Sequence, residues 1–155
     1  MAIAAIMLTL AAPGLQRSIQ RQQLAASANA LYYAIQFTRA EAIRRNITVR
    51  LAPRNLVNWE RGWRVHIDAG GRGHYRSGDR VLLTHPALPP GIAISGGSIA
   101  YNGLGQSIRG SGGKLAGTWR MERIERINGI AESRHIKLNF QGRPRLCNPA
   151  RDRRC

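Results

Sequence analysis

The C-terminal stretch NFQGRPRLCNPARDRRC, residues 139–155, carries the side chains best suited to chemistry. It holds five arginines and one acid, Asp152, together with both cysteines of the chain. A guanidinium group donates a planar pair of hydrogen bonds that matches a phosphate, so closely spaced arginines favour an anion-binding site. A solvated basic tail is the alternative. The five arginines are Arg143, Arg145, Arg151, Arg153 and Arg154.

Arg143 and Arg145 flank Pro144. Residues two apart in an extended chain project to the same side, with Cα atoms about 6–7 Å apart. Proline fixes its own backbone and biases the preceding residue towards an extended form. Two guanidinium groups are therefore presented side by side, at a spacing close to that of adjacent phosphates on a nucleic-acid strand. Proline also removes one ladder hydrogen bond, which predicts an edge strand. Charges that only protect such an edge from aggregation would look the same.

The two cysteines, Cys147 and Cys155, lie eight positions apart. This spacing does not resemble a metal site, which needs clustered Cys and His residues. We expect a disulfide formed outside the cytoplasm, with two free thiols as the alternative. The disulfide would close a small ring and hold the last three arginines near Arg143 and Arg145.

The other polar residues do not predict an active site. The four histidines lack metal-ligand spacing, and the eight acids are scattered. His66 and His135 are expected at outward strand positions. The glycine-rich segment 70–79 lacks the Gly-Lys-Ser/Thr ending of a phosphate loop and is expected to join two strands. We therefore expect no catalytic residue, no metal and no cofactor.

The overall charge favours a polyanionic partner. Among 155 residues, 24 are Lys or Arg and 8 are Asp or Glu, which gives a net charge of +16. Self-repulsion of this size is offset by nucleic acid, an acidic membrane surface or an acidic protein. An arginine-rich coding bias would give the same count, because only Lys114 and Lys137 are lysines.

One long helix is expected at the N-terminus. Residues 1–12 are apolar except for Thr9, and from residue 15 an apolar stripe recurs at helical spacing. A helix that runs from residue 1 to residue 46 would be roughly 70 Å long, more than a compact domain covers. Its N-terminal part should project while its C-terminal part packs on a sheet. The stripe consists of Leu24, Ala28, Leu31, Ile35 and Ala42.

Short strands follow the helix and predict an α+β fold, with one long N-terminal helix packed on antiparallel β-sheets. Strands are expected in the segments 47–51, 63–67, 81–84, 91–95, 98–101, 118–124 and 136–140. Pro53 is expected to interrupt the first strand. The chain is thus divided into an apolar anchor helix (1–14), an amphipathic helix (15–46) and a β-rich head with a basic tail (47–155).

Three segments together resemble the H-type minor pseudopilins, the GspH/FimT family. They are FTRAEAIRRNITVRL (37–51), SIAYNGLGQSIRG (98–110) and HIKLNFQGRPRLC (135–147). The likeness covers nearly the whole chain, and the order and spacing of the segments make it specific. It implies a pilin-like fold, other pilin subunits as partners, and insertion of the N-terminal helix in the bacterial inner membrane before assembly. It also implies a place in the periplasm or at the cell surface.

Within this family, the FimT-like minor pilins of type IV pili bind DNA for natural transformation and carry a Gly-Arg-x-Arg motif. Gly142, Arg143, Pro144 and Arg145 match the motif residue by residue. The resemblance implies sequence-independent DNA binding at this motif, extended by Lys137, Arg151, Arg153 and Arg154. The alternative is a structural minor pseudopilin at the tip of a type II secretion pseudopilus.

One part of the family pattern is missing. Family members begin with a basic leader, a Gly-Phe processing site and a glutamate five residues into the mature chain. The sequence from Met1 matches none of these. We expect that Met1 falls inside the apolar helix and that the start codon was placed late, which leaves the anchor helix truncated.

Overall fold

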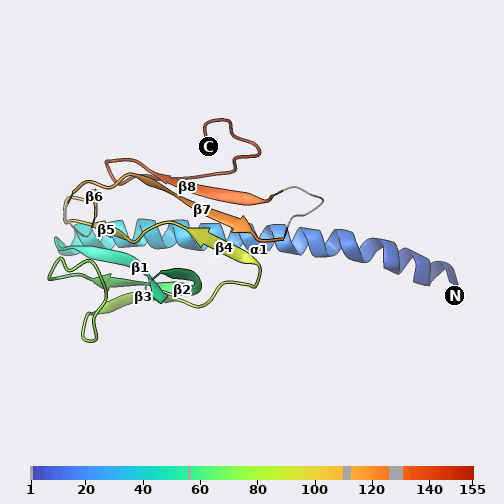
Figure 1. The fold of residues 1–155 in the computed structure, drawn as a ribbon, viewed down its shortest axis with the longest axis horizontal. Coiled ribbons are helices and arrows are strands. Elements are labelled where there is room, and N and C mark those ends of the chain that lie inside the picture. Colours follow the sequence, from blue (N-terminus) through green and yellow to red (C-terminus); the bar gives the residue numbers. More distant parts are fainter. Residues whose placement is uncertain (1, 56, 110–112, 126–130) are drawn as a thin grey trace.

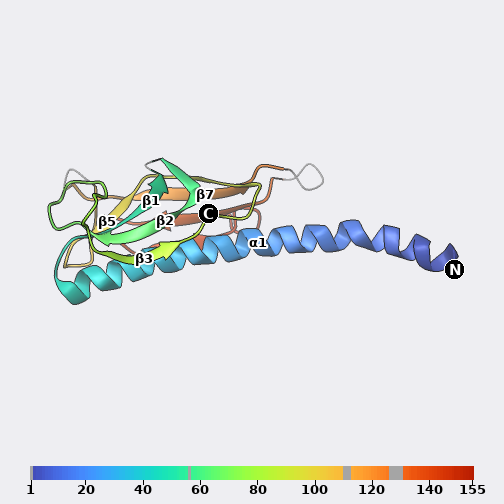
Figure 2. The same cartoon turned by 90° about the horizontal axis from the view of Figure 1, so that it is seen from below.

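The computed structural model describes residues 2–55, 57–109, 113–125 and 131–155, with side chains from Gly14 onward. Within these ranges a long helix, α1 (Ala2–Arg45), lies against two antiparallel sheets (Figure 1). Seen from below, α1 runs along one side of the head, and its N-terminal part extends beyond the sheets (Figure 2). The expected α+β arrangement is confirmed.

The apolar stripe of α1 faces the core. Its five members, from Leu24 to Ala42, are all fully buried, as the helical spacing predicted. In the projecting part, Leu15 and Ile19 are exposed. The stripe packs against strands of both sheets, so the helix is shared by the whole head.

The C-terminal end of α1 is stabilised by charge. Arg44 and Arg45 lie in the last turn, where cations oppose the negative end of the helix dipole. Their side chains donate to the Glu41 carboxylate, and these hydrogen bonds lower the pKa of Glu41 to about 2. Asn46 follows with a φ of 53°, the left-handed conformation that ends many helices.

Sheet A has five strands and sheet B has four. Sheet A has the order β3 (Val81–His85), β2 (Asn58–Ile67), β1 (Val49–Asn55), β5 (Ile99–Tyr101) and β6 (Ser107–Ile108). Sheet B has the order β4 (Ile92–Ser95), β7 (Gly117–Arg123), β8 (Ser133–Leu138) and β9 (Pro144–Cys147). All neighbouring strands are antiparallel.

Two buried tryptophans fix the backbone of the segment that connects β4 in sheet B to β5 in sheet A. The indole of Trp59 donates to the carbonyl of Gly96 at 2.8 Å, and that of Trp119 donates to the carbonyl of Gly97 at 2.7 Å. A Cβ on Gly96 would lie 2.1 Å from Cδ1 of Trp119, so the backbone comes this close only because residue 96 is glycine.

Two local predictions were wrong. Pro53 does not end β1, because it pairs with Trp63 and the strand continues to Asn55 after a register shift. His66 is on the outer face of sheet A but is fully buried, because Tyr75 from the 68–80 segment lies edge-on at 5.3 Å. Burial lowers the pKa of His66, and neither ring nitrogen has a hydrogen-bond partner among the described residues. Periodicity indicates which face a residue is on, but not whether a loop covers that face.

In the part of the chain that the structure describes, no helix has an apolar stretch long enough to cross a membrane. The division at residues 14 and 46, and the anchoring role of residues 1–14, are proposals.

The helix stripe can be tested at Leu31, which is fully buried. The substitution Leu31→Asp should lower the free energy of unfolding by roughly 3 kcal/mol or more, because a carboxylate without a partner would enter the core. Thermal melting followed by circular dichroism measures this. Asn29→Asp places the same charge on the exposed side of α1 and should change the melting temperature little. Equal melting temperatures for the two variants would show that Leu31 is not in the core.

Candidate nucleic-acid interface

Arg145 is on β9, which is at the edge of sheet B, and Arg143 immediately precedes this strand. The edge position predicted from Pro144 is confirmed. In the register with β8, Pro144 lies opposite Leu138 and Arg145 opposite Lys137. Alternation along the strands turns the buried Leu138 towards α1, and places Lys137 and Arg145 together on the outer face of sheet B.

A tight turn leads from β8 into β9. The amide of Gly142 donates to the carbonyl of Asn139 at 3.0 Å, and the amide of Arg143 donates to the Asn139 side chain at 2.9 Å. Gly142 has a φ of +78°, a conformation that residues with a Cβ rarely adopt. These bonds fix the direction in which the chain enters β9.

Gly142 is buried against Tyr101 and Gly105. An added Cβ would lie 2.6 Å from the carbonyl oxygen of Gly105 and 2.7 Å from the Tyr101 ring. The Tyr101 hydroxyl donates to the carbonyl of Gly142 at 3.0 Å, and burial raises the pKa of Tyr101, so this donor stays protonated. Gly142 therefore sets the path of the backbone before Arg143. Gly142 itself is buried.

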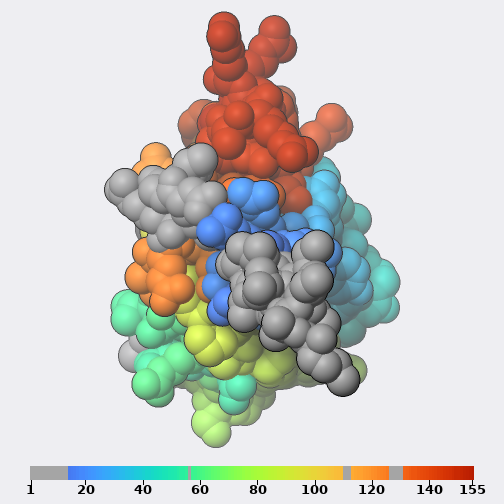
Figure 3. Space-filling view, turned by 90° about the vertical axis from the view of Figure 1, so that its right-hand side faces the viewer, coloured from blue at the N-terminus to red at the C-terminus, as the bar shows by residue number. Residues whose placement is uncertain are grey.

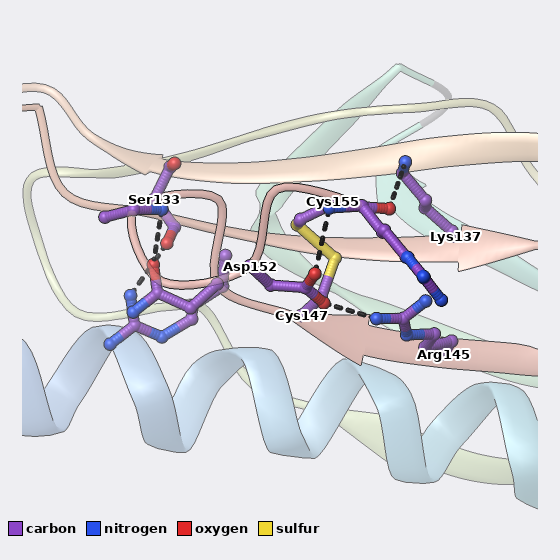
Figure 4. Close-up of a disulfide and its surroundings, with 10 residues drawn as sticks. Ser133, Lys137, Arg145, Cys147, Asp152 and Cys155 are labelled. Atoms are coloured by element: carbon purple, nitrogen blue, oxygen red, sulfur yellow. Dashed lines mark hydrogen bonds and ion pairs between the residues drawn. A yellow bond between two sulfur atoms is a disulfide. The ribbon is translucent and has the colours of Figure 1, made fainter.

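The chain end folds back over the outer face of β8 and β9. Cys147 and Cys155 form a disulfide, with Cα atoms 5.7 Å apart, as expected from the sequence. The ammonium group of Lys137 donates to the carbonyl of Arg154 at 3.0 Å, and Arg145 forms an ion pair with Asp152 (Figure 4). The tail is thus attached to the sheet at three points.

Hydrogen bonds inside the ring give the tail a defined shape. The amides of Arg151 and Asp152 donate to the carbonyl of Asn148 at 3.0 and 2.9 Å, and the amide of Cys155 donates to the carbonyl of Asp152 at 2.9 Å. The Asp152 carboxylate also accepts from the amide of Arg154 at 2.9 Å. We call this segment, Asn148–Cys155, the terminal ring. It forms a ridge that projects from the head (Figure 3).

Most of the predicted basic residues are exposed on this side of the molecule. The side chain of Arg145 is 55% exposed although it pairs with Asp152, and Lys137 is half-buried. Within the described ranges, no ion pair involves the other tail arginines, and all of these are exposed: Arg143, Arg151, Arg153 and Arg154.

Two further residues of this face, Arg120 and His135, were not predicted as part of the site, although His135 was expected at an outward strand position. Arg120 on β7 is opposite His135 on β8, and His135 is opposite Cys147 on β9. Arg120 is exposed, whereas His135 is half-buried. Burial and then the charge of Arg120 lower the pKa of His135, so the ring is neutral at pH 7. Alternation along β7 puts Arg120 on the exposed face of the strand, and the pairing of β7 with β8 places it beside His135.

A long helix packed on two antiparallel sheets, with a basic outer face, defines a pilin-type subunit. The fold is similar to the type IV minor pilin FimU of Pseudomonas aeruginosa, with a TM-score of 0.66 and 15% identity over 84% of this chain and 92% of that chain. It is also similar to the minor pseudopilin EpsH from the type 2 secretion system of Vibrio cholerae, with a TM-score of 0.59 and 12% identity over 82% and 98%.

The family model for the type II transport protein GspH matches residues 27–142. The chain therefore belongs to the GspH family, as the sequence resemblance indicated. Comparison with curated protein sequences gives no match. The family match ends at Gly142, so Arg143, Arg145 and the terminal ring lie outside the matched part.

The turn before β9 can be tested by Gly142→Ala. With a Cβ, the positive φ that the turn requires becomes strained, and the Cβ would also contact the Gly105 carbonyl. We therefore expect a loss of about 1–3 kcal/mol in the free energy of unfolding. Chemical denaturation measures this. Gly97→Ala is the control, because its added Cβ meets no atom within 4 Å. If both variants unfold like the parent, the turn does not constrain β9.

Proposed function

We propose that this protein is a minor pilin that binds DNA without sequence preference, for DNA uptake in natural transformation. The observation that carries the proposal is the terminal ring, a disulfide-closed group of arginines that an ion pair with Asp152 joins to Arg145 at an open sheet edge. One acid, Asp152, accompanies five arginines in residues 143–155. A positively charged surface of this kind attracts the phosphate groups of a nucleic acid whatever its base sequence.

The proposed contacts are with the DNA backbone. Arginine forms paired, charge-assisted hydrogen bonds with phosphate oxygens, and the exposed guanidinium groups of Arg143 and Arg145 are placed for this. The surface has a ridge and an edge strand, and neither is the helix or two-stranded ribbon that reads bases in a groove. Contacts to phosphate fix position but carry no sequence information. Binding is therefore independent of sequence.

Membership in the GspH family supports the assembly part of the proposal. Other pilin subunits would pack along α1, and its projecting N-terminal part would anchor the protein in the inner membrane before assembly. After assembly, the head and its basic face would be exposed in the periplasm or at the cell surface, where DNA is met.

A second candidate is a structural minor pseudopilin of a type II secretion system. The family description and the similar fold of EpsH favour it. In this case the basic face would contact acidic surfaces of neighbouring subunits. The two candidates differ in whether the isolated protein binds DNA.

The DNA site is tested by replacing Arg143 and Arg145 together with Gln in the full chain. Binding to a labelled duplex, measured by fluorescence anisotropy at several salt concentrations, should weaken sharply while the melting temperature stays unchanged. The slope of log affinity against log salt should fall by roughly one unit for each lost phosphate contact. Duplexes of unrelated sequence should bind alike.

A charge-matched control separates this site from the overall charge. Arg17 and Arg80 are exposed, lie far from the tail in the sequence and have no ion pair among the described residues. Arg17→Gln with Arg80→Gln removes the same charge and should leave most of the affinity intact. If both double variants bind equally, diffuse charge is responsible and the motif assignment is wrong.

The disulfide should affect binding more than stability. A ring of this size adds at most about 2–3 kcal/mol to the free energy of unfolding, and strain removes part of that. A fixed terminal ring also loses less conformational entropy when DNA binds. Cys147→Ser with Cys155→Ser should therefore weaken DNA binding with little change in melting temperature. Unchanged affinity would mean that the tail acts only through long-range attraction.

A further inference from the structure

A second group of arginines is on the outer face of sheet A, near the turn between β1 and β2. Two adjoining hollows open there, and Arg54 and Arg64 line both. The wider hollow, about 380 Å³, is completed by Asn55 and Arg61. The narrower hollow, about 110 Å³, is lined in addition by residues that include Ala52, Pro53, Tyr75 and Ser98.

Arg64 is held in place between the two hollows. Its Nη2 donates to the carbonyl of Arg54 at 2.8 Å, and its guanidinium carbon lies 4.1 Å from the centroid of the Tyr75 ring. Tyr75 is itself packed against the buried His66. The guanidinium group is thus oriented before any ligand binds, which reduces the entropy lost on binding.

The wider hollow gathers positive charge without a carboxylate to balance it. Within the described residues, no ion pair involves Arg54, Arg61 or Arg64. Both acids of the 68–80 segment have other partners: Asp68 Oδ2 accepts from Nε of the buried Arg50 at 2.9 Å, and Asp79 Oδ2 accepts from the amide of Arg76 at 2.7 Å. Three guanidinium groups around one hollow repel each other unless an anion is bound, and a phosphate accepts paired hydrogen bonds from such groups.

The narrower hollow offers a different surface. Ala52, Pro53 and the Tyr75 ring give it apolar walls, and its polar groups come from Ser98, His74 and the two arginines. A concave site with apolar walls and a few polar groups suits a planar ring. Since Arg54 and Arg64 border both hollows, a ring in the narrow hollow and a phosphate in the wide one can belong to one ligand.

We propose that these hollows bind a nucleotide unit, with its phosphate on Arg54, Arg61 and Arg64 and its base between Pro53 and Tyr75. We call this the Arg64 site. It does not depend on the DNA-binding proposal for the tail. The β1–β3 strands and the terminal ring lie at opposite ends of the head, at the bottom and the top of two views at right angles (Figures 1 and 3).

The test uses the full chain with Arg143→Gln and Arg145→Gln already present, so that the tail contributes little. Thymidine monophosphate and inorganic phosphate are titrated by isothermal calorimetry. The nucleotide should bind more tightly than phosphate alone. Adding Arg61→Gln and Arg64→Gln should weaken both by about tenfold or more, because charge-assisted hydrogen bonds are lost. The charge-matched pair Arg17→Gln and Arg109→Gln, at exposed arginines outside both groups, should leave both affinities nearly unchanged.

A further variant tests the narrow hollow. Ser98→Leu fills it, so binding of thymidine monophosphate should fall to the level of inorganic phosphate while phosphate binding persists. Melting curves confirm that each variant is folded. The proposal is overturned if the starting protein binds neither probe, which would leave the arginines as a subunit contact. It is also overturned if Arg61→Gln with Arg64→Gln behaves like the charge-matched pair.

The source of the nucleotide is distinguished by a short oligothymidylate in the same background. Tighter binding of the oligomer than of the monophosphate, lost with Arg61→Gln and Arg64→Gln, identifies a single strand as the ligand. Equal affinity for the two identifies a free mononucleotide. Either result supports the Arg64 site, and neither depends on whether the tail binds DNA.

Discussion

The buried face of α1 is the constraint from which the rest of the molecule follows. Leu24, Leu31 and Ile35 are fully buried, and each such side chain contributes about 1.5–3 kcal/mol relative to exposure. Strands of both sheets use this face as their common core. Once Ile136 and Leu138 are committed to the helix, strand alternation leaves Lys137 no position except the outer face. The basic surface is therefore a consequence of the core.

Two sets of buried contacts then fix the backbone beside the two groups of arginines. At the end of sheet B, the Tyr101 hydroxyl and the close approach of Gly142 to Gly105 set where β9 begins. On sheet A, the buried pair of Arg50 and Asp68 orders the segment after β2, because Asp68 also accepts the amides of Arg72 and Gly73. Removing one member of a buried pair leaves an uncompensated charge, so both must be kept. The Tyr101–Gly142 contact is next to the tail arginines, and the Arg50–Asp68 pair is next to the Arg64 site.

Local patterns in the sequence predicted the features that depend on local geometry. The helix stripe, the sheet edge at Pro144 and the disulfide follow from spacing and backbone chemistry alone. The features that local patterns could not predict depend on contacts between residues distant in the chain. His66 is buried because the 68–80 segment folds over it, and Arg120 joins the basic face because β7 pairs with β8. Arg54 and Arg64 meet because β1 pairs with β2: Ala52 lies opposite Arg64, so Arg54, two residues along β1, is a diagonal neighbour of Arg64 on the same face.

The two arginine groups lie at opposite ends of the head, and this limits how one ligand could use both. Duplex DNA has a persistence length of about 50 nm, so a short stretch held by the terminal ring does not bend around the head to reach Arg64. A flexible single strand could bend far enough to reach both groups. Two separate ligand molecules, one on each group, would not need to bend at all. Positive charge gathered on two separated faces would also repel itself less than the same charge on one face. Part of the net charge of +16 is thus distributed over separated surfaces of the head, which reduces its self-repulsion.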